Sequence, residues 1–180
     1  LARKLFFDAY VIIKNKNYKQ YALAEKKLLK SLSIMPNASY THNTLGLLYQ
    51  YWHNYPKAEY HLKKTIDDIP TWAKPHNNLG NVYQAQGNYK AALVEFNKAL
   101  ELDTSFIIPY NNIGNIYLET GQYLKAENTY KYRLGKDSLA LITVMNLGVL
   151  YNLRGQSDVA EQYYRKVVDM DSTYELGYVK

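Results

Sequence analysis

The sequence predicts an all-α fold, a solenoid of about five helix–turn–helix repeats, and two observations carry this prediction. Amphipathic helical patterns follow one another in pairs along the 180 residues, and a short turn joins the two members of a pair. The pattern returns at a constant spacing, so that Gly46 recurs as Gly80, Gly114 and Gly148. A fixed period of about 34 residues indicates units that stack on their neighbours to bury a continuous core.

The best-formed repeat covers residues 73–106 and sets the frame for the others. Its first helix contains Leu79-Gly80 and Tyr83, a turn follows at Gly87, and a second helical run extends from Lys90 to Leu102. Gly87 suits a left-handed residue that ends the first helix. Repeat two has His53 at this position, so we expect Asn54 to take the left-handed conformation there.

The remaining repeats follow in phase with this one. Residues 5–38 form a degenerate first repeat, whose second helix has apolar residues at helical spacing and ends near Pro36. Residues 39–72, 107–140 and 141–174 are repeats two, four and five, and 175–180 resemble the start of a further helix. Because Arg133 and Gly135 depart from the pattern of repeat four, we expect a looser or rotated junction between repeats four and five.

Small residues recur at fixed positions within the helices. Glycine inside a helix costs roughly 1 kcal/mol relative to alanine, so its recurrence implies a compensating gain, which we expect to be close approach of the paired helix. The expected second small residues of this contact are Ala24, Ala58, Ala92, Ala126 and Ala160. The recurring tyrosines Tyr49, Tyr83, Tyr117 and Tyr151 are expected to fill the space between neighbouring repeats.

These recurring positions resemble the tetratricopeptide-repeat (TPR) family over nearly the whole chain, so we treat 1–180 as a single TPR domain. The resemblance implies helix pairs stacked in a right-handed superhelix, with the first helix of each pair lining a concave groove. It also implies a scaffold that binds an extended peptide or a protein partner. The predicted peptide-binding residues are Tyr40, Asn43, Lys74, Asn77, Asn78, Asn81, Ile108, Asn111, Asn112, Asn115, Met145 and Asn146.

Asparagine is the repeated residue of this predicted surface. Its amide carries a donor and an acceptor, so a ladder of asparagines could follow a peptide backbone whatever side chains the peptide bears. This arrangement resembles the asparagine ladder of O-GlcNAc transferases. Since each hydrogen bond contributes only about 0.5–1.5 kcal/mol, apolar contacts are also needed, for which Ile108, Ile142, Met145 and Val149 are candidates. The alternative interpretation is that the asparagines solvate the groove or bond between helices.

The charge of the chain is concentrated at one end. Residues 1–30 hold eight of the 22 basic residues and two of the 16 acidic ones, which leaves 14 of each for the rest of the chain. The excess of six positive charges therefore lies within residues 1–30. It indicates either a solvated terminus or a basic docking patch for an acidic partner or a nucleic acid.

Several function classes find no support in the sequence. It contains no glycine-rich phosphate loop and no His-Glu-x-x-His motif, so we expect no enzyme, no cofactor and no metal site. His42 and His76 occupy equivalent positions and are expected at the groove edge. Chaperone-binding TPR domains hold a carboxylate with a clamp of Lys, Asn and Arg residues, and this sequence matches only part of that set. No nucleic acid is expected in the groove, because Lys74 is offset by Glu119.

Composition leaves the context of the chain open. No apolar run approaches the ~18 residues of a membrane helix, and no cysteine is present. We expect a soluble protein, with the cytoplasm the favoured compartment. Since the sequence lacks an initiator Met and stops inside a repeat, we expect a fragment of a longer protein. Two alternatives to a peptide-binding scaffold stay open: a regulatory or substrate-recruiting segment of a multidomain enzyme, and self-association through the C-terminal end.

Overall fold

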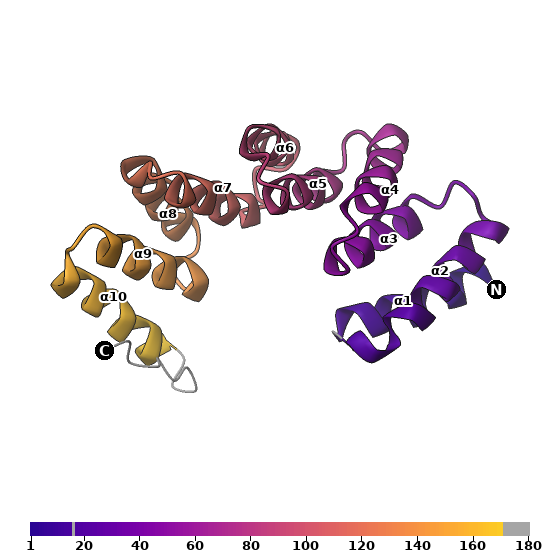
Figure 1. Ribbon diagram of the computed structural model, residues 1–180, viewed down its shortest axis with the longest axis horizontal. Coiled ribbons are helices and arrows are strands. Elements are labelled where there is room, and N and C mark those ends of the chain that lie inside the picture. The colour runs from indigo at the N-terminus through magenta and orange to yellow at the C-terminus, as the bar shows by residue number, and fades with distance from the viewer. Residues whose placement is uncertain (16, 171–180) are drawn as a thin grey trace. The chain divides into compact units, whose positions relative to one another are not determined.

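The computed structural model describes residues 1–15 and 17–170, whose regular structure consists of helices (Figure 1). Ten α-helices form five consecutive pairs in this part of the chain, and a short 3₁₀ helix η1 (Tyr18–Gln20) lies inside the first pair. The pairs are α1 (Ala2–Lys14) with α2 (Tyr21–Ile34), α3 (Ser39–Tyr51) with α4 (Tyr55–Asp68), α5 (Ala73–Ala85) with α6 (Tyr89–Leu102), α7 (Ile108–Glu119) with α8 (Tyr123–Lys136), and α9 (Leu141–Leu153) with α10 (Ser157–Met170). The predicted all-α fold of about five repeats is confirmed.

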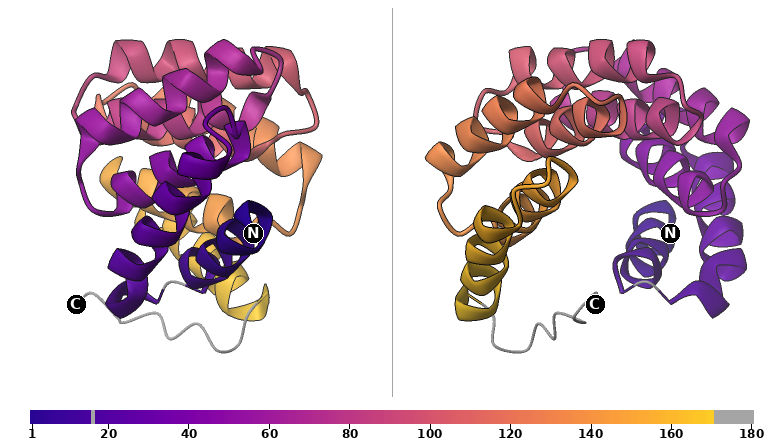
Figure 2. Two further views of the ribbon diagram at one scale, coloured as in Figure 1. Left: turned by 90° about the vertical axis from the view of Figure 1, so that its right-hand side faces the viewer. Right: turned by 60° about the vertical axis from the view of Figure 1, so that its left-hand side comes forward.

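The pairs belong to two compact units. Leu1–Asp103 holds α1 to α6, and Thr104–Lys180 holds α7 to α10. Figure 2 shows the two helices of each pair lying side by side within their unit. That 1–180 forms a single domain stays a prediction. The predicted start of a further helix at 175–180 lies outside the described residues.

The turns inside repeats two to five each have a left-handed residue, and in repeat two it is not the residue that was predicted. Gly87, Gly121 and Gly155 have φ of 75°, 72° and 73°. In repeat two His53 itself is left-handed, with φ of 55°, and the expectation for Asn54 is wrong. Asn54 has φ of −86° and caps α4, its side chain accepting a hydrogen bond from the Lys57 N–H. An N-cap requires non-helical backbone with negative φ, so the left-handed residue must precede it.

The recurring helical glycines make room for a large side chain. A Cβ on Gly80 would lie 2.5 Å from the Phe96 ring, and one on Gly148 would lie 2.5 Å from the Tyr164 ring. Leu62 and Tyr130 stand in the same relation to Gly46 and Gly114. Each glycine is therefore approached closely by the paired helix, as predicted. The group that comes closest is a large side chain of that helix, and not the alanine that was expected to face the glycine. These alanines are themselves fully or almost fully buried.

Each unit has its own apolar core. In the first unit Tyr21, Leu28, Leu45, Leu48 and Leu62 are almost completely buried in one cluster. In the second unit α8 and α9 share a cluster that includes Tyr130, Leu147 and Leu150. Arg133 is buried and pairs with Asp137 at 3.2 Å. The helices of repeats four and five share this core, and a looser or rotated junction between these repeats stays a prediction. No described helix is long and apolar enough to cross a membrane.

Candidate protein-interaction surface

Three asparagines of the predicted set are buried in the first unit, and two of them are bonded to each other. Asn43 on α3 and Asn77 and Asn78 on α5 are only 5–6% exposed. Asn78 Nδ2 donates a hydrogen bond to Asn43 Oδ1 at 3.1 Å. This bond links the first helices of repeats two and three. Burying an amide is tolerated here because a neighbouring amide supplies the partner.

The second unit has the same type of link with different partners. Asn146 Nδ2 on α9 donates to Asn115 Oδ1 on α7 at 2.9 Å, and the Tyr130 hydroxyl donates to the same oxygen at 2.6 Å. The Thr143 hydroxyl on α9 donates to Asn111 Oδ1 at 2.7 Å. Burial raises the pKa of Tyr130 well above its usual range, and the nearby Glu119 charge adds to this rise. The phenol therefore stays a hydrogen-bond donor at neutral pH.

These contacts correspond to the second interpretation of the asparagine pattern, in which the amides bond between helices. The constant repeat period places asparagines of adjacent first helices within reach of each other, and an unpaired buried amide would cost about 1–3 kcal/mol. Asn81 and Asn112 of the predicted set are half-buried. Whether any of these side chains also contacts a peptide stays a prediction.

The other predicted site residues lie at the surface of the first helices. Lys74 is exposed, Tyr40 is 63% exposed and Ile108 is 53% exposed, and all three come from the first or second residue of a first helix. The Tyr40 ring rests against Trp72, with 4.8 Å between ring centroids. Met145, in the middle of α9, is half-buried.

An exposed apolar surface of the second unit lies on α9, the first helix of repeat five. Ile142, Val149 and Leu153 are 58%, 37% and 56% exposed, and Met145 lies between them. We call these four residues the α9 stripe. Their spacing of three or four positions places them on one face of the helix. The opposite face is buried in the core, so α9 is apolar on both sides. Three of the four residues were predicted from the sequence; Leu153 was missed, although it continues the same spacing.

A tyrosine–glutamate bond joins successive repeats and was missed at the sequence level. Tyr49, Tyr83 and Tyr151 donate their hydroxyls to Glu25, Glu59 and Glu127 at 2.6, 3.1 and 2.7 Å. Each tyrosine thus reaches the second helix of the preceding repeat, beyond the space filling that was predicted. Burial and the Glu25 bond raise the pKa of Tyr49 well above its usual range. The signal in the sequence is a glutamate 24 residues before each of these three tyrosines. The corresponding position before Tyr117 holds Leu93, which cannot form this bond.

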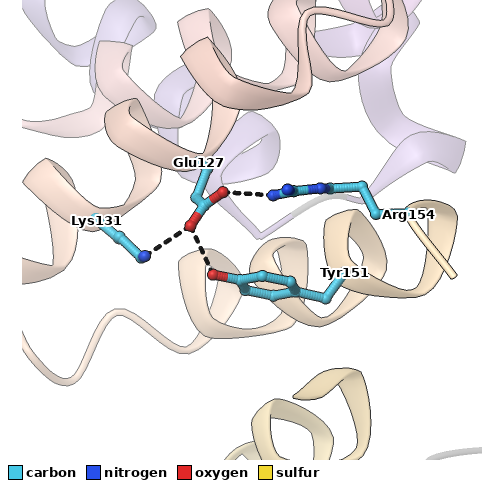
Figure 3. Close-up of polar contacts among 4 residues, drawn as sticks. All are labelled: Glu127, Lys131, Tyr151 and Arg154. Atoms are coloured by element: carbon cyan, nitrogen blue, oxygen red, sulfur yellow. Dashed lines mark hydrogen bonds and ion pairs between the residues drawn. The ribbon is translucent and has the colours of Figure 1, made fainter. Parts of the chain in front are cut away.

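Glu127 is the most highly connected of these carboxylates (Figure 3). It accepts from the Tyr151 hydroxyl at 2.7 Å, from Lys131 Nζ at 2.6 Å and from Arg154 Nη1 at 2.6 Å. The Lys131 ammonium, followed by the Tyr151 hydroxyl, lowers the pKa of Glu127 below its usual range. The cluster therefore holds α8 against α9 and has a structural role.

His42 and His76, the two histidines predicted at the groove edge, each contact the second helix of their own repeat. His76 Nδ1 lies 2.7 Å from a Glu95 oxygen, and His42 Nδ1 lies 2.8 Å from His61 Nδ1. These pairs occupy equivalent positions in repeats three and two. Burial, followed by the charge on His42, lowers the pKa of His61 to about 4. Among residues 1–15 and 17–170, no group of three or more His, Cys, Asp or Glu side chains is placed to hold a metal ion.

Comparisons with known proteins agree with this architecture. Residues 80–121 match the family described as TPR repeat, and residues 143–174 match the one described as tetratricopeptide repeat. No curated protein matches the chain significantly. Among solved structures, TTC0263, a thermophilic TPR protein of Thermus thermophilus, is similar with a TM-score of 0.79 and 16% identity, over 96% of this chain and 92% of that one.

Two further structures share the fold. MamA has a TM-score of 0.72 and 23% identity, over 89% of this chain and 94% of its own. YrrB, described as a TPR protein with an unusual peptide-binding site, has a TM-score of 0.66 and 18% identity, over 97% of this chain and 88% of its own. At these identities the likeness concerns the fold alone. The two matched segments are thus identified as tetratricopeptide repeats, and the paired helices of the chain share the fold of such proteins.

Proposed function

We propose that this chain is a protein-interaction scaffold that binds an extended peptide segment of a partner on the exposed face of α7 and α9, the first helices of its second unit, with the α9 stripe as the main apolar contact. The observation that carries the proposal is the exposure of Ile142, Val149 and Leu153 on a helix whose other face is already packed in the core. Since the core does not need these side chains, burial by a partner is the use that their chemistry supports.

The asparagines have a supporting part in this proposal. Asn146 lies between Met145 and Leu147 and bonds back to Asn115 on α7. The bond ties α9 to α7 beneath the exposed side chains, so the stripe is held in place before a partner arrives. A preorganised surface loses less conformational entropy on binding. Any asparagine contact with the peptide backbone would add to the affinity that the apolar contacts provide.

Other predicted residues add exposed chemistry within each unit. Ile108, on α7 of the same unit, adds an exposed aliphatic group. Tyr40 and Lys74, on the first helices of the other unit, offer an aromatic ring and a positive charge. Each unit thus presents its own exposed chemistry, and we propose that the aliphatic side chains of the peptide contact α9.

A selection experiment tests the proposal. The chain is screened against a library of unstructured peptides beside two variants, Ile142→Ser/Val149→Ser and Asn78→Ala/Asn112→Ala/Asn146→Ala. We expect the wild-type chain to select peptides with aliphatic residues. The serine variant should lose at least about tenfold in affinity, because two apolar contacts are removed, while its helicity and melting temperature stay close to wild type.

The asparagine variant separates the two roles of the amides. If the amides mainly bond between helices, this variant should be less stable than wild type. When affinity is measured at a temperature where the variant is folded, it should fall less than the affinity of the serine variant. Retention of full affinity by the serine variant would contradict the proposed role of α9. Val94→Ser on α6, whose side chain is 62% exposed, is the matched control and should bind as wild type does.

A further inference from the structure

The exposed side of α1 combines an apolar centre with positive charges at both ends. Phe7, Tyr10 and Val11 are 60%, 37% and 52% exposed. Arg3 and Lys4 lie near the start of the helix and Lys14 is its last residue, and all three cations are exposed. We call these six residues the α1 outer face. Their spacing places them on one side of the helix, with about 16 Å between its first and last cations along the helix axis.

The other side of α1 is fixed in the core of the first unit. Ala9 and Ile13 are buried in the cluster with Tyr21 and Leu28. The Ser31 hydroxyl on α2 donates to the Ala2 carbonyl at 3.1 Å. The α1 outer face is therefore held on a packed helix and is not needed for its packing.

Within the described residues no direct ion pair holds the cations of the α1 outer face, and the nearest acidic residues have other partners, although the charge of Lys4 also acts on Asp8. Asp8 pairs with Lys27 at 2.7 Å, and Glu25 accepts the Tyr49 hydroxyl. None of the ion pairs found in the described chain involves Arg3, Lys4 or Lys14. Part of the positive excess of residues 1–30 is thus displayed beside exposed aromatic and aliphatic groups.

We infer that the α1 outer face is a docking surface for an acidic amphipathic helix of a partner protein, a second site that is separate from the one proposed on α9. Such a helix would lie along α1, place its apolar side chains on Phe7, Tyr10 and Val11, and bring a carboxylate to the cations at each end. Helices recognise each other in this way through apolar residues three and four positions apart, with charges that set orientation.

The arrangement of the charges favours a protein over other polyanions. A nucleic acid is held by cations along the whole contact, because phosphates recur along its backbone. An anionic membrane surface needs a larger apolar area or a polybasic cluster for stable binding. Here the cations lie at the two ends and the centre is apolar, which complements a helix with an apolar centre and acidic ends.

The test measures binding of the full chain to a labelled synthetic peptide by fluorescence anisotropy. The probe is a helical peptide slightly longer than α1, with a glutamate near each end and leucines between them on the same face. A peptide with lysines in place of the glutamates and a scrambled peptide of equal composition are the comparisons. We expect the acidic peptide to bind at least about tenfold more tightly than both at low salt, and to weaken as salt is raised.

Two variants and a control locate the site. Lys4→Glu/Lys14→Glu and Phe7→Ser/Val11→Ser should each lower the affinity about tenfold or more. Lys90→Glu/Lys166→Glu reverses two exposed lysines elsewhere and should leave the affinity unchanged. Circular dichroism checks that each variant is folded. Peptides selected through α9 should bind both α1 variants as they bind wild type, so failure at one site is distinguishable from failure at the other.

Three results would overturn the inference. One is equal binding of the acidic and scrambled peptides. Another is binding of phosphatidylserine vesicles through the same residues without binding of the acidic peptide, which would assign the face to a membrane surface. The third is a dimer in light scattering that Phe7→Ser/Val11→Ser converts to a monomer, which would assign the face to a second copy of the chain.

Discussion

The first helices α5 and α9 occupy equivalent positions in repeats three and five, yet their exposed faces differ. The large apolar side chains of α5 are all buried or half-buried, and its exposed face begins with Lys74. On α9 the exposed face carries Ile142, Val149 and Leu153. The buried sides are alike, since each helix has a glycine against an aromatic ring and an asparagine bonded to a neighbouring first helix. The repeat is thus maintained by its buried positions, and its exposed positions are free to differ in chemistry.

The largest change in stability is expected for variants that test whether the buried sides of α5 and α9 are equivalent. Gly80→Ala and Gly148→Ala would each place a methyl group 2.5 Å from an aromatic ring. Overpacking of this kind costs about 1–3 kcal/mol even though alanine favours the helix. We expect both variants to lower the free energy of unfolding by similar amounts, measured by urea denaturation.

Gly135→Ala on α8 is the control for that pair, because a Cβ there meets nothing within 4 Å. It should raise stability by up to about 1 kcal/mol through helix propensity alone. A stabilising effect at Gly80 or Gly148 would show that the close packing of glycine against the ring does not hold there.

A second prediction compares repeats two and three through their histidine pairs. The folded-state pKa of His61 is about 4, below the value of 6.5 for an unperturbed histidine. A depressed histidine pKa means that the folded state binds fewer protons than the unfolded state. The contribution of this pair is therefore fully present above pH 6.5 and is lost as pH falls from 6.5 to 4. With allowance for solvent screening, the loss should reach about 2 kcal/mol.

His61→Glu copies the histidine–glutamate pair of repeat three and should reduce this loss. The measurement is urea denaturation at several pH values across the range between these two pKa values, on wild type and variant. Equal acid dependence in the two proteins would exclude the His42–His61 contact as its cause.

The smallest expected effect concerns the bond between repeats. Tyr151→Phe removes the hydroxyl that bonds to Glu127 and keeps the ring. Glu127 retains Lys131 and Arg154 as partners, so the loss should be only about 0.5–1.5 kcal/mol. Hydrogen exchange should show faster opening of α9 than in wild type. Unchanged exchange and stability would mean that the two cations hold this junction without the tyrosine.

The fold could be predicted well from the sequence because a constant period determines which residues repeat together. Ile142 and Val149 were placed on an exposed face for the same reason. The hydrogen-bond partners of Asn78 and Asn146 could not be predicted, because the partner depends on the distance between neighbouring helices and not on phase alone. The constant Tyr–Glu separation was visible in the sequence, but its meaning required knowing which second helix faces each tyrosine.

The most direct test of recognition by the first helices is methyl NMR of the chain with a peptide selected in the library screen. We predict that the Ile142 and Val149 methyl resonances shift on titration, while that of Val94 on α6, also exposed but on a second helix, does not. Shifts at Val94 with no change at Ile142 and Val149 would contradict the assignment of recognition to the first helices.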